Sequence, residues 1–253
     1  MSAPEAYVAW INEHVGFNPR GQAHSDFLSA RIVADLVDHC QKLGDRFRNG
    51  QLELRQNVGL NGVRHSSPLA VPITGVEDID LDPNIDGVIL GAGHTYALGH
   101  VAAPLTLENK TIMTAHAKAR TNRFNDARAY AGHVHTASPD TIAAFTIVIN
   151  TALRYRNPDA FARSAAHSGV NRPDDAAKTI GLFRRMPLRS LASDPVNRCE
   201  AVLILAIDYD GESPSAQLIA GDPAPPAGDP YSYDWFLDRL CGLFKERLAT
   251  GSS

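Results

Sequence analysis

Two nearly continuous apolar segments constrain the fold of this chain most strongly. Residues 141–150, TIAAFTIVIN, and residues 201–209, AVLILAIDY, place apolar side chains on both alternating sets of positions. A strand of this composition needs cover on both faces, which is typical of a central strand between layers of helices. The sequence therefore predicts one α/β domain over residues 1–253, with a central mixed β-sheet flanked by helices.

The remaining elements are predicted from shorter patterns. Apolar residues at helical spacing predict helices over about residues 5–15, 25–43, 116–134 and 233–248, with Gly44 ending the second. Alternating or short apolar runs predict further strands at residues 51–58, 85–90 and 105–110. The stretch between the last two of these strands contains Gly91 and Gly93, and it is expected to form a tight hairpin.

Composition narrows the class of protein. No run approaches the ~18 apolar residues of a transmembrane helix, and residues 1–16 lack the pattern of a secretory signal. The three cysteines, Cys40, Cys199 and Cys241, are widely spaced and form no CxxC motif, so they are interpreted as buried thiols. A cytoplasmic protein that does not enter a membrane is expected.

The distribution of charge is uneven along the chain. The formal net charge is −4, yet residues 101–200 contain 14 Lys and Arg against 8 Asp and Glu. A local excess of positive charge is what an anionic substrate requires, although a mixed, solvated surface would give the same count.

The segment Pro104–Arg128 carries the most specific chemistry. Period-2 alternation over residues 105–110 places Glu108 and Lys110 on one face of a strand. A carboxylate there can hold a divalent metal, and a lysine beside it can orient water or meet charge that develops on a phosphate. A basic helix follows directly, so the segment indicates a phosphodiester substrate.

Asp86 opens one apolar strand, and Glu108-Asn109-Lys110 closes the next. This arrangement resembles the PD-(D/E)XK nuclease superfamily, which includes many restriction endonucleases. The resemblance covers about residues 24–150 and leaves residues 151–253 as a C-terminal elaboration. It implies a restriction-endonuclease-like core and a metal-dependent endonuclease that hydrolyses DNA in a restriction or other defence role.

The resemblance also implies roles for individual residues. Asp86 and Glu108 would be ligands of Mg²⁺, or of Mn²⁺ in its place, with the backbone carbonyl of Asn109 as a further ligand. Lys110 would lie beside the attacking water. The proline expected next to the aspartate is absent, and Asp82, which precedes Pro83, competes with Asp86 for that role.

The basic helix and the last helix predict partners. Four cationic residues at the start of the basic helix are expected to bind DNA: His116, Lys118, Arg120 and Arg123. The two arginines are predicted to lie off the core stripe of that helix. The last helix has a wide apolar face that includes Trp235 and Phe244, which predicts either a homodimer interface or packing in the protein's own core.

Alternative interpretations stay open. A DNA-binding subunit could keep a nuclease-like core without catalysis. Gly91-Ala92-Gly93 after a strand suggests a dinucleotide-binding turn, with a weak match. The HxH pair His133 and His135, with His94 and His100 in the same region, suggests a zinc enzyme. Gln22, His24 and Asp26 are interpreted as helix-capping residues, with a role as helper metal ligands as the alternative.

Overall fold

The computed structural model describes residues 1–14, 23–55, 87–90, 103–156, 169–212 and 214–250. Its centre is a six-stranded sheet in the order β1-β2-β3-β4-β7-β8. These strands are β1 (Leu52–Arg55), β2 (Gly87–Leu90), β3 (Leu105–Ile112), β4 (Ile142–Asn150), β7 (Ala201–Asp208) and β8 (Gln217–Leu218). The first five strands are parallel and β8 is antiparallel to β7, so the sheet is mixed, as predicted.

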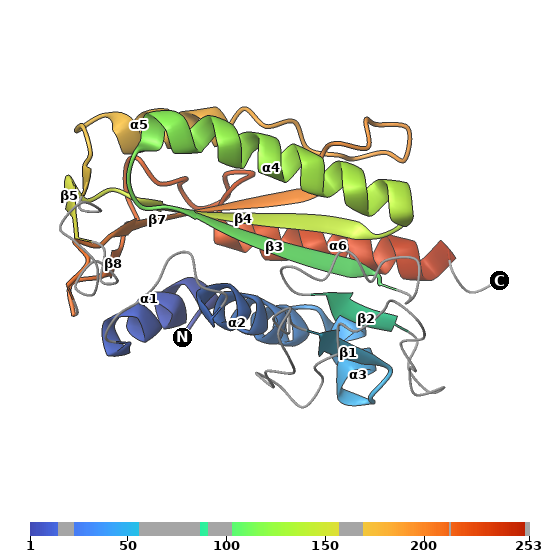
Figure 1. Ribbon diagram of the computed structural model, residues 1–253. Helices are drawn as coiled ribbons and strands as arrows, with labels where there is room; N and C mark the ends of the chain where they lie inside the picture. The colour runs from blue at the N-terminus through green and yellow to red at the C-terminus, as the bar shows by residue number, and fades with distance from the viewer. Residues whose placement is uncertain (15–22, 56–86, 91–102, 157–168, 213, 251–253) are drawn as a thin grey trace, which may run out of the picture.

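Helices cover both faces of the sheet (Figure 1). One layer contains α4 (His116–Ala137) and α5 (Asp175–Phe183). The other contains α1 (Ala3–Glu13), α2 (Ala23–His39), α3 (Gln41–Arg48) and α6 (Tyr233–Thr250). Every residue of β4 and all but the last of β7 are buried, which confirms the prediction that these apolar runs are central strands.

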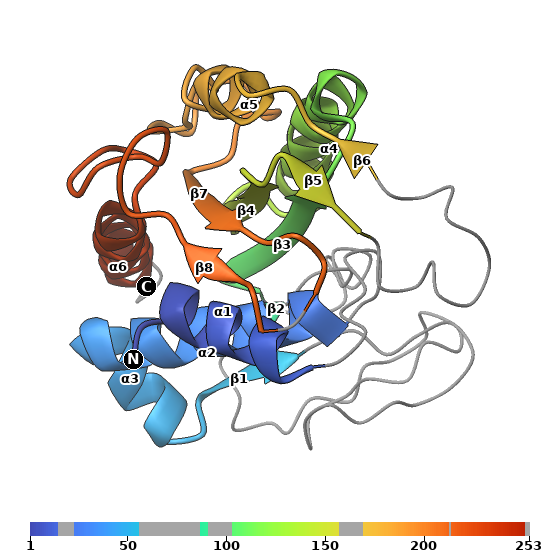
Figure 2. The same ribbon diagram turned by 90° about the vertical axis from the view of Figure 1, so that its left-hand side faces the viewer.

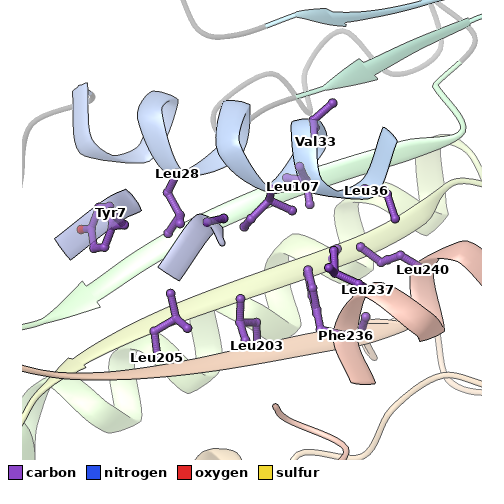
Figure 3. Packing of buried hydrophobic residues seen from close by; sticks show 14 of the residues in the cluster. Tyr7, Leu28, Val33, Leu36, Leu107, Leu203, Leu205, Phe236, Leu237 and Leu240 are labelled. Atoms are coloured by element: carbon purple, nitrogen blue, oxygen red, sulfur yellow. The ribbon is translucent and has the colours of Figure 1, made fainter. Parts of the chain in front are cut away.

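The core on the α2 and α6 side is built from one set of alternating strand residues. Figure 3 shows Leu107 of β3 and Leu203 of β7 facing the apolar side chains of the two helices. Leu28 of α2 and Phe236 of α6 are fully buried there. Complete burial of one such side chain contributes about 1.5–3 kcal/mol, so this layer stabilises the fold substantially.

The opposite alternating set forms the second core. Phe145 of β4 packs there with Ala127 and Ala131 of α4 and with Phe183 of α5. Alanines on α4 allow the helix to lie close to the sheet, and the larger phenylalanines fill the remaining space. The predicted core spacing of α4 is therefore confirmed.

A separate two-stranded antiparallel ribbon lies at the carboxyl ends of the parallel strands (Figure 2). It consists of β5 (Arg154–Tyr155) and β6 (Gly169–Val170). A Cβ atom at Gly169 would lie 2.7 Å from Thr114 Cγ2, so glycine permits close packing against the residues that follow β3.

Three local predictions are wrong. The strands β2 and β3 pair in parallel, and parallel strands cannot be joined by the tight hairpin that the glycines suggested. The second helix does not end at Gly44. Instead α2 ends at His39, and after Cys40 a separate helix, α3, runs through Gly44. Cys40 and Cys241 form a disulfide with a Cα–Cα distance of 5.4 Å, and only Cys199 among the three cysteines is a free, buried thiol.

The described residues of the C-terminal half belong to the same sheet and helical layers as the described residues before them. They provide β7, which pairs with β4 along seven residues, and α6, which packs on the α2 layer. None of the helices in the described part of the chain is long and apolar enough to cross a membrane.

Candidate active site on strand β3

Glu108 and Lys110 lie on the same face of β3, as predicted. Thr106, on this same alternating set, bonds to Tyr130 of α4, so the set faces the α4 layer. The carboxylate of Glu108 and the ammonium of Lys110 are in direct ionic contact. The Glu108 side chain is 11% exposed and that of Lys110 is 33% exposed, so the pair is accessible mainly through the lysine.

Asn109 points to the opposite face and fastens β3 to α2. Its Nδ2 donates to the carbonyl oxygen of Ser25 at 3.0 Å and to Ser29 Oγ at 2.7 Å. The side chain is buried, and its Oδ1 has no hydrogen-bond partner. The sequence gives no signal for this contact, because the partners lie 80 and 84 residues away.

The backbone groups of Asn109 point away from β4, toward the β2 side of β3. The N–H of Ile142 donates to the carbonyl of Pro104, so even-numbered residues of β3 direct their backbone groups toward β4. Alternation then directs the Asn109 carbonyl to the other edge. The described part of β2 ends with Leu90 opposite Thr106, and no residue of it lies beside Asn109. Within the described part of the chain, no strand residue pairs with Asn109 on that side, so its carbonyl oxygen is a candidate ligand.

The surroundings of Glu108 on the α4 side are buried. The Tyr130 hydroxyl lies 2.7 Å from Thr106 Oγ1 and donates to the carbonyl of Ala144 at 3.2 Å. Burial raises the pKa of Tyr130 well above its ordinary value, and the negative charge of Glu108 adds to this effect. The uncharged Tyr130 side chain thus borders Glu108 on the side toward the amino end of β3. A charge in this medium interacts more strongly than it does in water.

The donor set fits a hard divalent cation. Glu108 and the Asn109 carbonyl offer oxygen ligands, and Mg²⁺ is commonly held by one or two carboxylates together with substrate phosphate and water. Asp86 and its rival Asp82 lie outside the described residues. Among the residues that are described, no three His, Cys, Asp or Glu side chains are grouped as a metal site.

His116 is not a DNA contact, and this prediction is wrong. The residue is fully buried, and its Nδ1 lies 3.1 Å from Thr179 Oγ1 of α5. Burial lowers the pKa of His116, so the ring stays neutral at neutral pH. The basic segment pointed to a phosphate contact, but the first residue of α4 faces the neighbouring helix.

The other cationic residues of α4 differ in their surroundings. Lys118 is exposed, and Arg123 Nη1 forms an ion pair with Asp126 at 2.7 Å. Arg120 is half-buried, and its Nη1 is buried without a hydrogen-bond partner. The prediction that Arg120 lies off the core stripe is wrong, because residues 120, 124, 127 and 131 share one helical face.

The residues of the zinc alternative do not converge where the structure describes them. His133 is exposed, whereas His135 is buried and bonds to Glu200 and to the carbonyl of Val196. His94, His100 and the turn Gly91–Gly93 lie outside the described residues.

The residues considered as helix caps or helper metal ligands lie at the start of α2, where two of them are described. His24 is buried inside α2, with its Nδ1 3.3 Å from the Tyr7 hydroxyl, so it is not a cap. Asp26 lies in the first turn of α2, and Gln22 is not among the described residues.

Comparisons with known proteins identify no relative. No family model matches the sequence, and neither a curated protein nor a solved structure is significantly similar to it. The resemblance to PD-(D/E)XK nucleases therefore stays a prediction that depends on the residues themselves.

Proposed function

We propose that this protein is a metal-dependent endonuclease that hydrolyses phosphodiester bonds of DNA, in a restriction or other defence role. The observation that carries the proposal is the Glu108-Asn109-Lys110 segment, which places a carboxylate and an ammonium on one face of β3 and a backbone carbonyl on its β2 side. These groups are the kinds that a phosphodiesterase site needs. A restriction-endonuclease-like core, with Asp86 as the second metal ligand, is part of this proposal.

Each group has a separate task in the proposed reaction. Glu108 and the Asn109 carbonyl would hold a Mg²⁺ or Mn²⁺ ion at β3. When bound, that ion would supply Lewis-acid activation of the phosphate. Lys110 orients the attacking water and stabilises negative charge on the phosphate oxygens. The hydrogen bonds from Asn109 to α2 keep the strand in place while the two flanking side chains act.

The charge of α4 supports an anionic polymer as substrate. Three cationic residues lie near the start of α4, soon after β3: Lys118, Arg120 and Arg123. Of these, Lys118 is exposed to solvent. Cations at this position raise the rate of encounter with DNA and bind its phosphates.

Incubation of supercoiled plasmid with the wild-type protein tests the proposal. Nicking or linearisation is expected with Mg²⁺ or Mn²⁺, and EDTA is expected to abolish it. Persistence of cleavage in EDTA, or its absence with both metals, counts against a metal-dependent nuclease.

A second candidate is a non-catalytic DNA-binding subunit with a nuclease-like core. One observation favours it: Lys110 neutralises Glu108 directly, so the pair satisfies itself without a metal. This candidate predicts DNA binding that is insensitive to EDTA, with no cleavage under any metal condition.

A further inference from the structure

Helix α4 lies over strands β3 and β4 and turns one face toward β3 (Figure 1). Because β3 and β4 are parallel, the helix that joins them runs in the opposite direction. The Tyr130 hydroxyl lies 2.7 Å from Thr106 Oγ1, near the amino end of β3. Ala119, close to the start of the helix, packs against the core cluster that contains Ile112, at the carboxyl end of β3. These contacts show which part of α4 lies over which part of β3.

Arg123 and Asp126 belong to the face of α4 that carries Tyr130. They precede Tyr130 by seven and four residues, which are about two turns and one turn of a helix. Four residues of helix rise about 6 Å, and two residues of strand span roughly 6.6 Å. Asp126 therefore lies at the level of Glu108, and Arg123 lies near the level of Lys110.

The burial of α4 agrees with this placement. Arg123 and Asp126 are half-buried, whereas Asn122 and Asn125 on the outer side of the helix are exposed. A helix that packs on a sheet buries the side chains of its inner face and exposes the others. The side chains of Arg123 and Asp126 keep 39% and 40% of their surface exposed, so a small ion can reach them from solvent.

Arg123 holds the Asp126 carboxylate by one of its two oxygens. Arg123 Nη1 donates to Asp126 Oδ2 at 2.7 Å. Within the described part of the chain, Asp126 Oδ1 accepts no hydrogen bond. Carboxylates that bind a metal are commonly held in this way, because a hydrogen bond to one oxygen orients the other.

A surface ion pair between residues three apart needs no further role, and α3 contains one. Arg48 Nη2 lies 3.0 Å from Asp45 Oδ1, with side chains 54% and 56% exposed. The pair on α4 differs because it is less exposed and because it faces a second ion pair, Glu108 with Lys110. Two carboxylates brought together at a partly buried position repel each other, and a divalent cation bound by both removes this repulsion.

We propose that Asp126 is a further carboxylate ligand of the divalent metal at Glu108, and that Arg123 is a positioning residue that orients Asp126. The inference rests on the proposed function and deepens it, because it adds a ligand from α4 to those on β3. Two carboxylates are a common protein share for Mg²⁺, and Glu108 with Asp126 supplies such a pair within the described residues.

Isothermal titration of the DNA-free protein with MnCl₂ tests this role without any dependence on cleavage. Asp126→Asn is expected to weaken Mn²⁺ binding about tenfold or more, in the same direction as Glu108→Gln. Arg123→Ala is expected to weaken it about tenfold, as the loss of a group that orients a ligand does, and Arg123→Lys should restore part of the affinity. The matched control is Asp45→Asn, which removes an ion pair of the same spacing from α3 and should leave the affinity unchanged.

The outcomes separate this inference from the proposed function. Wild-type Mn²⁺ affinity in Asp126→Asn, an equal loss in Asp45→Asn, or no Mn²⁺ binding by the wild-type protein overturns the role of Asp126, even when the wild-type protein cleaves plasmid. Mn²⁺ binding that depends on Asp126, without cleavage of plasmid, supports this ligand and contradicts the nuclease proposal. Circular dichroism confirms that each variant is folded, as expected for changes at partly exposed positions.

Discussion

At the residue scale, Asn109 connects the candidate site to the N-terminal helices. Asn109→Ala removes the hydrogen bonds that its amide donates to the Ser25 carbonyl and to Ser29 Oγ. We expect the free energy of unfolding to fall by about 1–3 kcal/mol, as measured by urea denaturation. Ser29→Ala removes only one of these bonds and should cost less. An unchanged stability of Asn109→Ala would show that this side chain does not fasten α2 to β3.

Lys118 and Arg123 differ in how freely they can meet a phosphate. Lys118 is exposed, whereas Arg123 is held by Asp126. Lys118→Ala is therefore expected to lower the salt slope of DNA binding by about 1, and Arg123→Ala by less than that. The reverse order, with Arg123 dominant, would contradict this assignment of the phosphate contact.

At the element scale, Glu200 joins several elements at the amino end of β7. Its buried carboxylate accepts hydrogen bonds from His135 of α4, from Arg189 and from Arg247 of α6. Burial alone would raise the pKa of Glu200, but the bonds from His135 and Arg247 outweigh it and hold the pKa below the ordinary value. At pH values above the unfolded-state pKa of Glu200, the ionised carboxylate therefore stabilises the folded protein. This contribution is lost as the pH falls through the lower folded-state pKa.

Glu200→Gln tests this network. Near pH 7 we expect a loss of about 3–5 kcal/mol, because buried cationic partners lose their counter-charge. The difference from wild type should narrow as the pH falls through the folded-state pKa of Glu200. Urea unfolding at neutral and acidic pH measures both effects, with the exposed Glu13→Gln as control. A difference that widens in acid would contradict the assigned direction of the pKa shift.

The elements show which parts of the fold are predictable from sequence. The strands β4 and β7 and the face of α4 follow from their apolar patterns, because burial on one or both sides dictates composition directly. The ribbon strands β5 and β6 have two residues each, too few for a period to be visible. The hydrogen-bond partners of Glu200 lie 11 to 65 residues away in the sequence, and a local sequence pattern cannot predict contacts over such separations.

The site was predictable to the same extent. The shared face of Glu108 and Lys110 follows from the period of a strand, and the structure confirms it. The burial of His116 and of part of Arg120 depends on how α4 packs against α5 and the sheet. Sequence spacing alone could not separate the cations that face solvent from those that face the core.

At the scale of the whole molecule, the apolar face of α6 belongs to the core. Phe244 is 1% exposed and packs in the layer between α2 and the sheet, so of the two predicted roles of this face the structure supports packing in the core. Trp235 is half-buried. The homodimer itself stays a prediction, without an interface on this helix face.

Phe244→Ala distinguishes the two roles of this face. We expect a loss of about 3–5 kcal/mol in the free energy of unfolding, because the change leaves a cavity in the core. The mass of the folded protein by light scattering should equal that of wild type. A mass half that of wild type, together with wild-type stability, would instead support Phe244 as part of a dimer interface.

The most direct test of the central claim is plasmid cleavage by Glu108→Gln and Lys110→Ala with saturating Mg²⁺. Both substitutions are expected to abolish cleavage while the circular dichroism spectrum stays that of wild type, because each removes a group that acts on the phosphate. Glu13→Gln makes the same chemical change as Glu108→Gln at an exposed position and should keep full activity. Full activity of either Glu108→Gln or Lys110→Ala would contradict the assignment of the active site to strand β3.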